Sequence, residues 1–349
     1  MFKLRYLLFI SIVFYISIFS GCNEKRNDGN AESSLRKNEK KSSGSSGYFY
    51  FVGIINEKPG LYKYNFSSKK SAKFWFNKYE NVLQLSYSPD KNFAFFITAE
   101  NISKLGVFSY LTNVRLYLLN AKSSEVFFLK NIGSGFQVFT SWETKNAFKI
   151  ILNSPDKGNV TYVNQTTGYF NTYGKELMEQ TKTYDITKDG YPNPPKTKGN
   201  NISQNSKYRI FSVDSISTSI FLQIISSGKN ILITSVNQDL KQTSWTDDGK
   251  FVVFSTASIS TENLANNPES GMSGIFIYSI RENKIIHQWN VSGVGNFLLI
   301  NDFLIFDNGF GNTSSIEIFE IRSLKNFNTI KIKGGCGLQG VTQTPGYNA

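Results

Sequence analysis

The sequence predicts an all-β fold, and more specifically a β-propeller of six four-stranded antiparallel sheets, with seven blades as the alternative. From Tyr48 onward, short runs of Phe, Tyr, Ile and Val are separated by polar clusters at roughly 8- to 12-residue spacing, which is typical of many-stranded antiparallel proteins. Two kinds of strand-and-turn unit also recur along the chain. Helical periodicity is almost absent, and residues 174–185 are the one segment for which we expect a short helix.

The recurring units together account for the four strands of each sheet. The first unit is a polar turn followed by a hydrophobic strand, and it begins at Tyr87, Ser141, Ser203 and Ser244. The second is an aromatic strand, a polar turn and a return strand, and it begins at Gly60, Val114, Asn159, Ser219, Gly274 and Ile316. We expect the turn of the Asn159 unit at Asn164. The second unit recurs at roughly 40 to 60 residues, and four-stranded sheets at such a period indicate propeller blades. An irregular β-sandwich is the alternative.

Closure of the ring leads to a specific expectation about the two ends of the folded part. Residues Tyr48–Val52 precede the first complete unit and have no sheet of their own. We expect them to pair with the last strands of the chain, near Ile330–Ile332, because an unpaired strand edge invites aggregation.

Three stretches resemble a known family. Residues 88–96 ("SPDKNFAFF") and 246–255 ("TDDGKFVVFS") resemble the turn and strand of TolB-type, WD40-like propellers, and residues 116–129 resemble the hairpin of that family. The turn has a physical reason, because Asp bonds the backbone of its own turn and Gly accepts a positive φ. The resemblance implies a propeller from residue 48 to about 335. The amino-terminal domain of TolB has no counterpart, which puts that protein's role in doubt for this chain.

The beginning of the chain has the pattern of a secretory signal peptide. Lys3 and Arg5 form a positive head, and the apolar run 6–19 is shorter than the roughly 20 residues that a membrane-spanning helix needs. Residues 19–22 (Phe-Ser-Gly-Cys) resemble the lipobox of bacterial lipoproteins. The resemblance implies cleavage between Gly21 and Cys22 and acylation of Cys22. An ordinary signal peptide and an uncleaved short anchor are the alternatives.

The expected organisation follows from these features. It comprises a signal peptide (1–21), the lipidated Cys22 with a disordered tether (22–47), the propeller (48–340) and a C-terminal tail (341–349). The tether is expected because its composition is polar, with no aromatic residue, and cannot offset the entropy of ordering. The only other cysteine is Cys336. If Cys22 carries lipid, the fold must stand without an internal disulfide.

The sequence shows no constellation of catalytic residues. A hydrolase of the serine type needs a Gly-x-Ser-x-Gly elbow with an acid and a histidine, and no such elbow occurs. The only histidine, His287, is on a predicted strand, where a packing role is expected. Asp247 and Asp248 are adjacent and are interpreted as turn formers. We therefore expect no enzyme, no cofactor and no metal site, and a propeller-scaffold hydrolase is the least favoured alternative.

The charge and the predicted export define the expected partners. The formal net charge is +12, but the lysines are scattered through turns, and nucleic-acid binding calls for clustered positive charge. We expect no nucleic acid, a monomer held at a membrane of the bacterial cell envelope by the lipid anchor, and an envelope protein as partner. A carbohydrate or small ligand is the alternative. The longest predicted loops, 99–113, 185–203 and 258–273, are the expected contact surfaces.

Overall fold

All regular secondary structure among the described residues is β-strand. The computed structural model describes residues 47–341, except 57, 106–107, 191, 193–201, 204, 215–217, 258–271, 293–295, 310–313 and 339. In that part of the chain there is no helix of the length and apolar character that a membrane span requires.

The described strands form six antiparallel sheets, numbered here in chain order. Sheet one contains β24 (Lys333–Gly337), β1 (Tyr48–Ile55), β2 (Lys58–Asn65) and β3 (Lys70–Trp75). Sheet two contains β25 (Gly340–Val341), β4 (Asn81–Tyr87), β5 (Phe93–Ala99), β6 (Asn101–Leu105), β7 (Phe108–Asn120) and β8 (Glu125–Gly135). Sheet three contains β9 (Gln137–Thr144), β10 (Ala147–Pro155), β11 (Tyr162–Asn171) and β12 (Glu176–Asp185).

The second half of the chain forms the other three sheets. Sheet four contains β13 (Tyr208–Asp214), β14 (Thr218–Ile224) and β15 (Lys229–Val236). Sheet five contains β16 (Asp239–Trp245), β17 (Phe251–Ala257), β18 (Met272–Ser279) and β19 (Lys284–Ser292). Sheet six contains β20 (Phe297–Ile300), β21 (Phe303–Asn308), β22 (Ser315–Glu320) and β23 (Lys325–Lys331).

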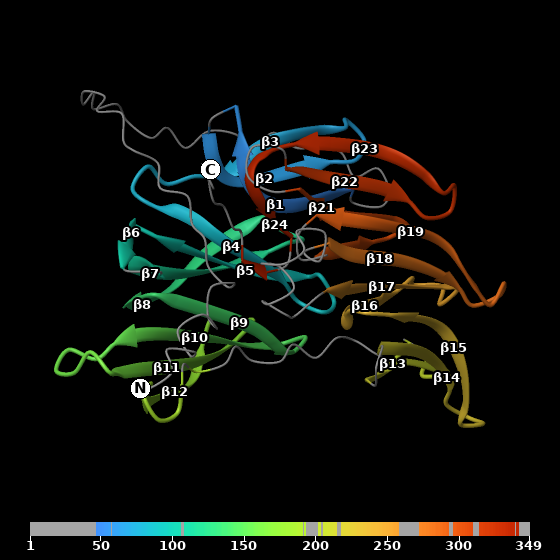
Figure 1. The fold of residues 1–349 in the computed structure, drawn as a ribbon. Coiled ribbons are helices and arrows are strands. Elements are labelled where there is room, and N and C mark those ends of the chain that lie inside the picture. Colours follow the sequence, from blue (N-terminus) through green and yellow to red (C-terminus); the bar gives the residue numbers. More distant parts are fainter. Residues whose placement is uncertain are drawn as a thin grey trace.

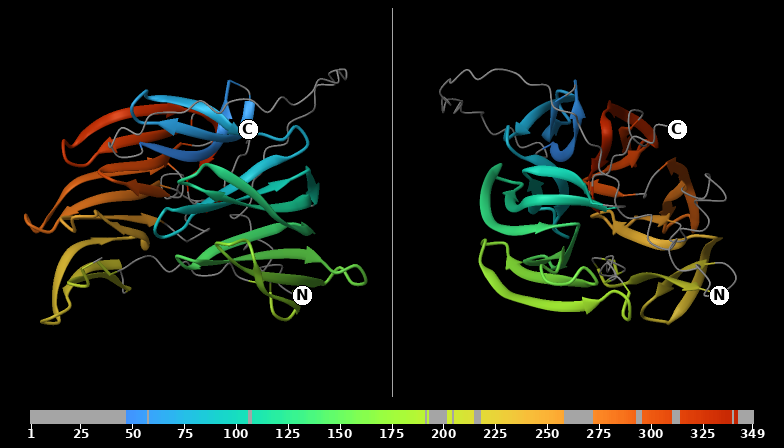
Figure 2. Two further views of the ribbon diagram at one scale, coloured as in Figure 1. Left: turned by 180° about the vertical axis from the view of Figure 1, so that it is seen from behind. Right: turned by 60° about the vertical axis from the view of Figure 1, so that its left-hand side comes forward.

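The sheets follow one another around a ring, and the fold is a β-propeller. Figure 2 shows sheets one to three on one side of the molecule and sheets four to six on the other, so that the chain makes one circuit. Sheet six returns to sheet one at the top of Figure 1. The all-β prediction is confirmed. The number of blades stays a prediction, because parts of the chain lie outside the described residues.

Burial decreases from the inner strands to the outer ones. Every residue of β5 after Phe93 is buried, because the sheets on either side cover both of its faces. The outermost strand β12 is exposed along most of its length and carries mainly polar side chains. The hydrophobic core is divided into clusters between neighbouring sheets, one of which joins Phe95 of sheet two to Phe148 and Phe170 of sheet three.

The two ends of the folded part pair in one sheet, as the sequence predicts. Strand β1 pairs with β24, with Val52 opposite Gly337, a few residues beyond the segment expected to be its partner. The chain then continues to β25, which pairs with β4 of sheet two. The carboxyl end therefore contacts the first two sheets, and it closes the ring through backbone hydrogen bonds.

The turn at residues 88–93 has a defined geometry. In sheet two the Ser88 hydroxyl accepts a hydrogen bond from the Phe93 amide (3.1 Å) and donates one to Asp90 Oδ1 (2.7 Å). The same oxygen of Asp90 accepts from the amide of Asn92 (3.2 Å). Sheets four and five repeat these bonds with the sets Ser203, Asn205, Lys207 and Tyr208, and Thr246, Asp248, Lys250 and Phe251. These hydrogen bonds explain why a hydroxyl residue and an Asp or Asn recur at fixed positions of the turn.

Two local predictions are wrong. Residues 174–185 are not helical, because all of β12 pairs with β11 as the outer strand of sheet three. The turn expected at Asn164 is also absent, since Asn164 lies within the continuous strand β11. The turn of this hairpin is at residues 172–175, where Gly174 has a φ of 78°. Tertiary pairing overrides local propensity in both places.

Candidate functional site

The site residues named from the sequence lie outside the described part of the chain. These are Gly21 and Cys22, so cleavage and acylation stay predictions. Of the expected contact loops, 185–203 and 258–273 are described only in part. The third, 99–113, is described except for residues 106–107, and it contributes β6 and the beginning of β7, which pair with each other.

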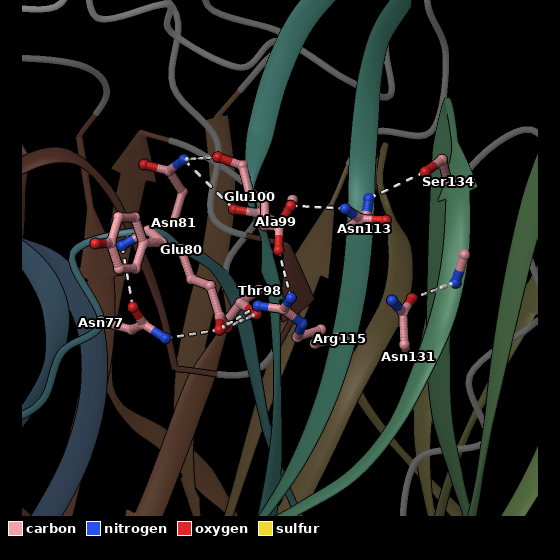
Figure 3. A network of polar contacts seen from close by, with 12 residues as sticks. Asn77, Glu80, Asn81, Thr98, Ala99, Glu100, Asn113, Arg115, Asn131 and Ser134 are labelled. Carbon is pink, nitrogen blue, oxygen red and sulfur yellow. Dashed lines mark hydrogen bonds and ion pairs between the residues drawn. The ribbon is translucent and has the colours of Figure 1, made fainter.

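A cavity of about 570 Å³ opens beside this third loop, at one end of sheet two. Its lining comes from three segments that converge there. The β3–β4 connection supplies Asn77, Lys78, Tyr79 and Glu80, β4 supplies Asn81, the β5–β6 junction supplies Glu100, and β7 supplies Arg115. Figure 3 shows Asn77, Glu80, Asn81, Glu100 and Arg115 in a network of polar contacts. We call this site the Glu80 recess.

Glu80 is the centre of the network. Its side chain is only 2% exposed, yet its carboxylate accepts hydrogen bonds from four side chains. Thr98 Oγ1 lies at 2.5 Å, Asn77 Nδ2 at 2.7 Å, and the Tyr117 hydroxyl at 2.9 Å from the nearer oxygen. Arg115 Nη1, at 2.5 Å, provides the opposite charge. A buried carboxylate is tolerated only when it is paired and hydrogen-bonded, and both conditions hold here.

Arg115 links this buried carboxylate to a second one at the surface. Its Nη2 contacts Glu100, whose other oxygen accepts from Asn113 Nδ2 at 2.6 Å. The hydrogen bond from Asn113, with support from Arg115, lowers the pKa of Glu100. The hydrogen bond to Glu80 raises the pKa of Arg115. Burial, with Glu80 close by, raises the pKa of Tyr117 to about 12. These shifts keep Glu100 and Arg115 charged and Tyr117 neutral over the physiological pH range.

The rim of the recess is aromatic and exposed. Tyr79 is 66% exposed, and Phe76, from the same connection, is 54% exposed. The Lys78 ammonium lies 4.8 Å from the centre of the Tyr79 ring. A hydrogen bond from the Tyr79 amide to Asn77 Oδ1 (3.0 Å) holds the tip of the connection in place. The recess thus presents a polar floor with the flat ring of Tyr79 beside it.

Other candidate groups of the sequence lie elsewhere. His287 is on β19 and packs against Trp289 and Phe319, with ring centres 4.2 and 4.8 Å away, and burial lowers its pKa. The described residues contain no group of three or more His, Cys, Asp or Glu side chains suited to hold a metal ion. The lining of the Glu80 recess offers hydrogen bonds and charge but no Ser, Cys or His nucleophile.

Comparisons with known proteins find similar folds at low sequence identity. No protein-family model and no curated protein sequence matches the chain. The solved structure of TolB from Acinetobacter baumannii is 13% identical, with a TM-score of 0.44 over 86% of this chain and 67% of TolB. A structure from Bacteroides fragilis, described as that of a candidate 6-phosphogluconolactonase, is 13% identical, with a TM-score of 0.43 over 85% of this chain and 98% of that one. These likenesses carry no functional conclusion for this chain.

The sequence predicts part of the recess but not its centre. The segment 99–113, an expected contact surface, supplies Glu100 and Asn113. Glu80 and Arg115 are 35 positions apart and belong to no motif, so the sequence does not single them out. The one signal in the sequence is Arg115 itself, a charged residue inside the otherwise apolar run 114–119. A charge in such a position needs a partner in the fold.

Proposed function

We propose that this chain is a lipid-anchored β-propeller of the bacterial cell envelope that works as a protein-binding or scaffolding module. The observation that carries the binding role is the Glu80 recess, whose lining combines the exposed Tyr79 side chain with Arg115. Tyrosine and arginine are enriched among the residues that dominate binding energy at protein interfaces. Recognition groups held by strands and a hydrogen-bond network are also more accurately placed than groups on free loops.

The anchor part of the proposal is supported by the sequence of residues 1–22 alone. Two acyl chains give stable attachment, since each buried methylene contributes about 0.8 kcal/mol and one chain alone is marginal. Metabolic labelling with a fatty-acid analogue tests it directly. We expect the label on the wild-type protein and on a Cys336→Ala control, and none on Cys22→Ala. Label on Cys22→Ala, or none on the wild type, would disprove the anchor.

The binding part is tested by placing a photo-reactive phenylalanine analogue at position 79 in intact cells. We expect a specific protein adduct, because Tyr79 stands at the rim of the recess. The same analogue at Tyr173 is the control, since Tyr173 is 91% exposed but lies on sheet three. A protein captured equally at both positions, or at neither, would contradict binding at the recess.

One observation favours a saccharide ligand as the second candidate. The lining mixes donors and acceptors, as sugar hydroxyl groups require, and the exposed Tyr79 ring offers a flat face beside them. The volume of about 570 Å³ is within the range of small-ligand sites. Saturable binding of purified protein to an immobilised saccharide panel, lost in Tyr79→Ala and retained in Tyr173→Ala, would favour this candidate over a protein partner.

A further inference from the structure

A second cavity, of about 240 Å³, lies at the end of the ring where the turns between the first two strands of several sheets meet. Sheet two contributes Lys91 and Asn92, sheet five contributes Asp247, and sheet six contributes Asn301. Tyrosine side chains from β1 and β4 complete the wall. We call this site the turn-face cavity. It is distinct from the Glu80 recess, with which it shares no lining residue.

The backbone at Lys91 is unusual for a residue with a long side chain. Lys91 has a φ of 60°, a left-handed conformation that glycine adopts freely and that costs other residues free energy. The equivalent position of the sheet-five turn is Gly249, with a φ of 66°, so the turn itself accepts glycine. The equivalent position in sheet four is Ser206, with a φ of 56°. The turn geometry therefore does not require lysine at this position.

The side chain of Lys91 puts an ammonium group into the cavity wall. Burial lowers the pKa of Lys91, and the Asp247 carboxylate from sheet five opposes that effect. Within the described part of the chain, the ammonium donates no side-chain hydrogen bond and forms no direct ion pair. An ammonium has three donors, so a ligand or water must satisfy them.

The tyrosine wall is rigid and its polar groups are already bonded. The Tyr87 hydroxyl donates to the Tyr50 carbonyl at 2.9 Å, and the Tyr48 hydroxyl donates to the Ala121 carbonyl at 2.8 Å. These rings therefore define the shape of the cavity, and the charged side chains of the lining would recognise a ligand. The volume is that of about eight water molecules at ~30 Å³ each, which limits the ligand to a small molecule.

We propose that the turn-face cavity binds a free α-amino acid as the zwitterion, with its carboxylate on Lys91 and its ammonium toward Asp247. The charges of the lining select this class. A plain carboxylate would meet the repulsion of Asp247 and Asp90, and a plain amine would meet that of Lys91 and Lys122. A molecule that carries both charges is complementary to both walls. Ligand binding would explain why this turn has a lysine at a position where glycine would be less strained.

Isothermal titration of the full-length purified protein tests the proposal. The probes are glycine, L-alanine and L-serine, with acetate and methylamine as single-charge probes. We expect at least one amino acid to bind at least tenfold more tightly than acetate and methylamine. The absence of amino-acid binding, or equal binding of acetate, would overturn the proposal.

Two substitutions then locate the site. Lys91→Gly removes the ammonium and relieves the backbone conformation, so it should fold and lose at least tenfold in amino-acid affinity. Ser206→Gly makes the same kind of change at the equivalent turn outside the cavity and should bind as the wild type does. Asp247→Asn should also lose at least tenfold, which provides a second variant if Lys91→Gly fails to fold. Wild-type affinity in Lys91→Gly, or in Asp247→Asn, would place binding elsewhere and disprove the site.

Discussion

At the scale of single residues, the buried carboxylate of Glu80 depends on each of its hydrogen-bond partners for its stability. Glu80 has a basic group on one side and two hydroxyl groups and an amide on the others, so both of its oxygens are fully used. Replacing such a carboxylate by an amide of the same shape removes the charge. It also points an NH₂ group at donors that need an acceptor.

Glu80→Gln should therefore lower the free energy of unfolding by about 2–4 kcal/mol, the range for breaking a buried pair while a second partner for the arginine remains. Urea unfolding followed by fluorescence measures the loss. Glu125→Gln is the matched control, because Glu125 is exposed on β8 of the same sheet and should change stability by no more than about 0.5 kcal/mol. Equal effects in the two variants would show that the network contributes nothing to folding.

At the scale of elements, the repeated turn is the best defined local structure. Ser88 is 1% exposed, and its hydroxyl serves the Phe93 amide and Asp90 together. Ser88→Ala leaves the partly buried Phe93 amide without its acceptor, and we expect a loss of about 1–2 kcal/mol in the free energy of unfolding. Ser227→Ala is the control, because Ser227 accepts one long bond (3.3 Å) in an exposed turn. Thermal unfolding that ranks the two variants alike would contradict this role of the motif.

The elements also show how far sequence reasoning reaches. The turns at Ser88 and Thr246 were recognisable because a hydroxyl, an acid and a left-handed position recur at fixed offsets. The hairpins that begin at Gly60 and Val114 were recognisable because an aromatic strand precedes a polar turn. These signals are local, so they can be recognised in a single sequence.

The features that the sequence does not predict depend on contacts between residues that are distant along the chain. Residues 174–185 contain good helix formers, but β11 offers a complete partner edge, and an outer strand can be polar on both faces. The Glu80–Arg115 pair is likewise created by the return of β7 alongside β5. Neither the edge nor the pair exists until the sheet has formed. The local sequence around Arg115 indicates that a partner is needed, but it does not identify Glu80 as that partner.

At the scale of the whole molecule, stability depends on closure of the ring by the carboxyl end. Strand β24 supplies the inner strand of sheet one, and Leu338, just after it, is fully buried in the same core. A chain ending after Ile332 would lose both, and it would expose the edge of β1.

We expect that truncated chain to lose its cooperative unfolding transition and to aggregate, because an open sheet edge and an uncovered core replace a closed ring. A chain ending after Thr342 removes only residues 343–349 and should unfold as the wild type does. Calorimetry of the two chains makes the comparison. A cooperative transition in the chain that ends after Ile332 would show that closure is dispensable.

The pH dependence of stability is also a property of the whole ring. Burial lowers the pKa of Lys241, on β16, to about 8, and Asp307 opposes this effect. Between pH 8 and about 10 the unfolded chain keeps a proton that the folded chain has lost, so the free energy of unfolding rises with pH. A shift from 10.5 to about 8 sets an upper bound of about 3 kcal/mol on this rise. Lys91, whose pKa is also lowered, contributes in the same direction.

Above pH 10 the sign reverses. Burial raises the pKa of Tyr50, Tyr87 and Tyr117, so the unfolded chain loses its phenol protons first and the free energy of unfolding falls. Urea unfolding between pH 7 and 11 should therefore show maximum stability near pH 10. In Lys241→Met the rise from pH 8 to 10 should shrink, because the variant lacks the lysine whose pKa burial lowers to about 8, while Lys91 still contributes. An undiminished rise in that variant would mean that the proton lost on folding belongs to another group.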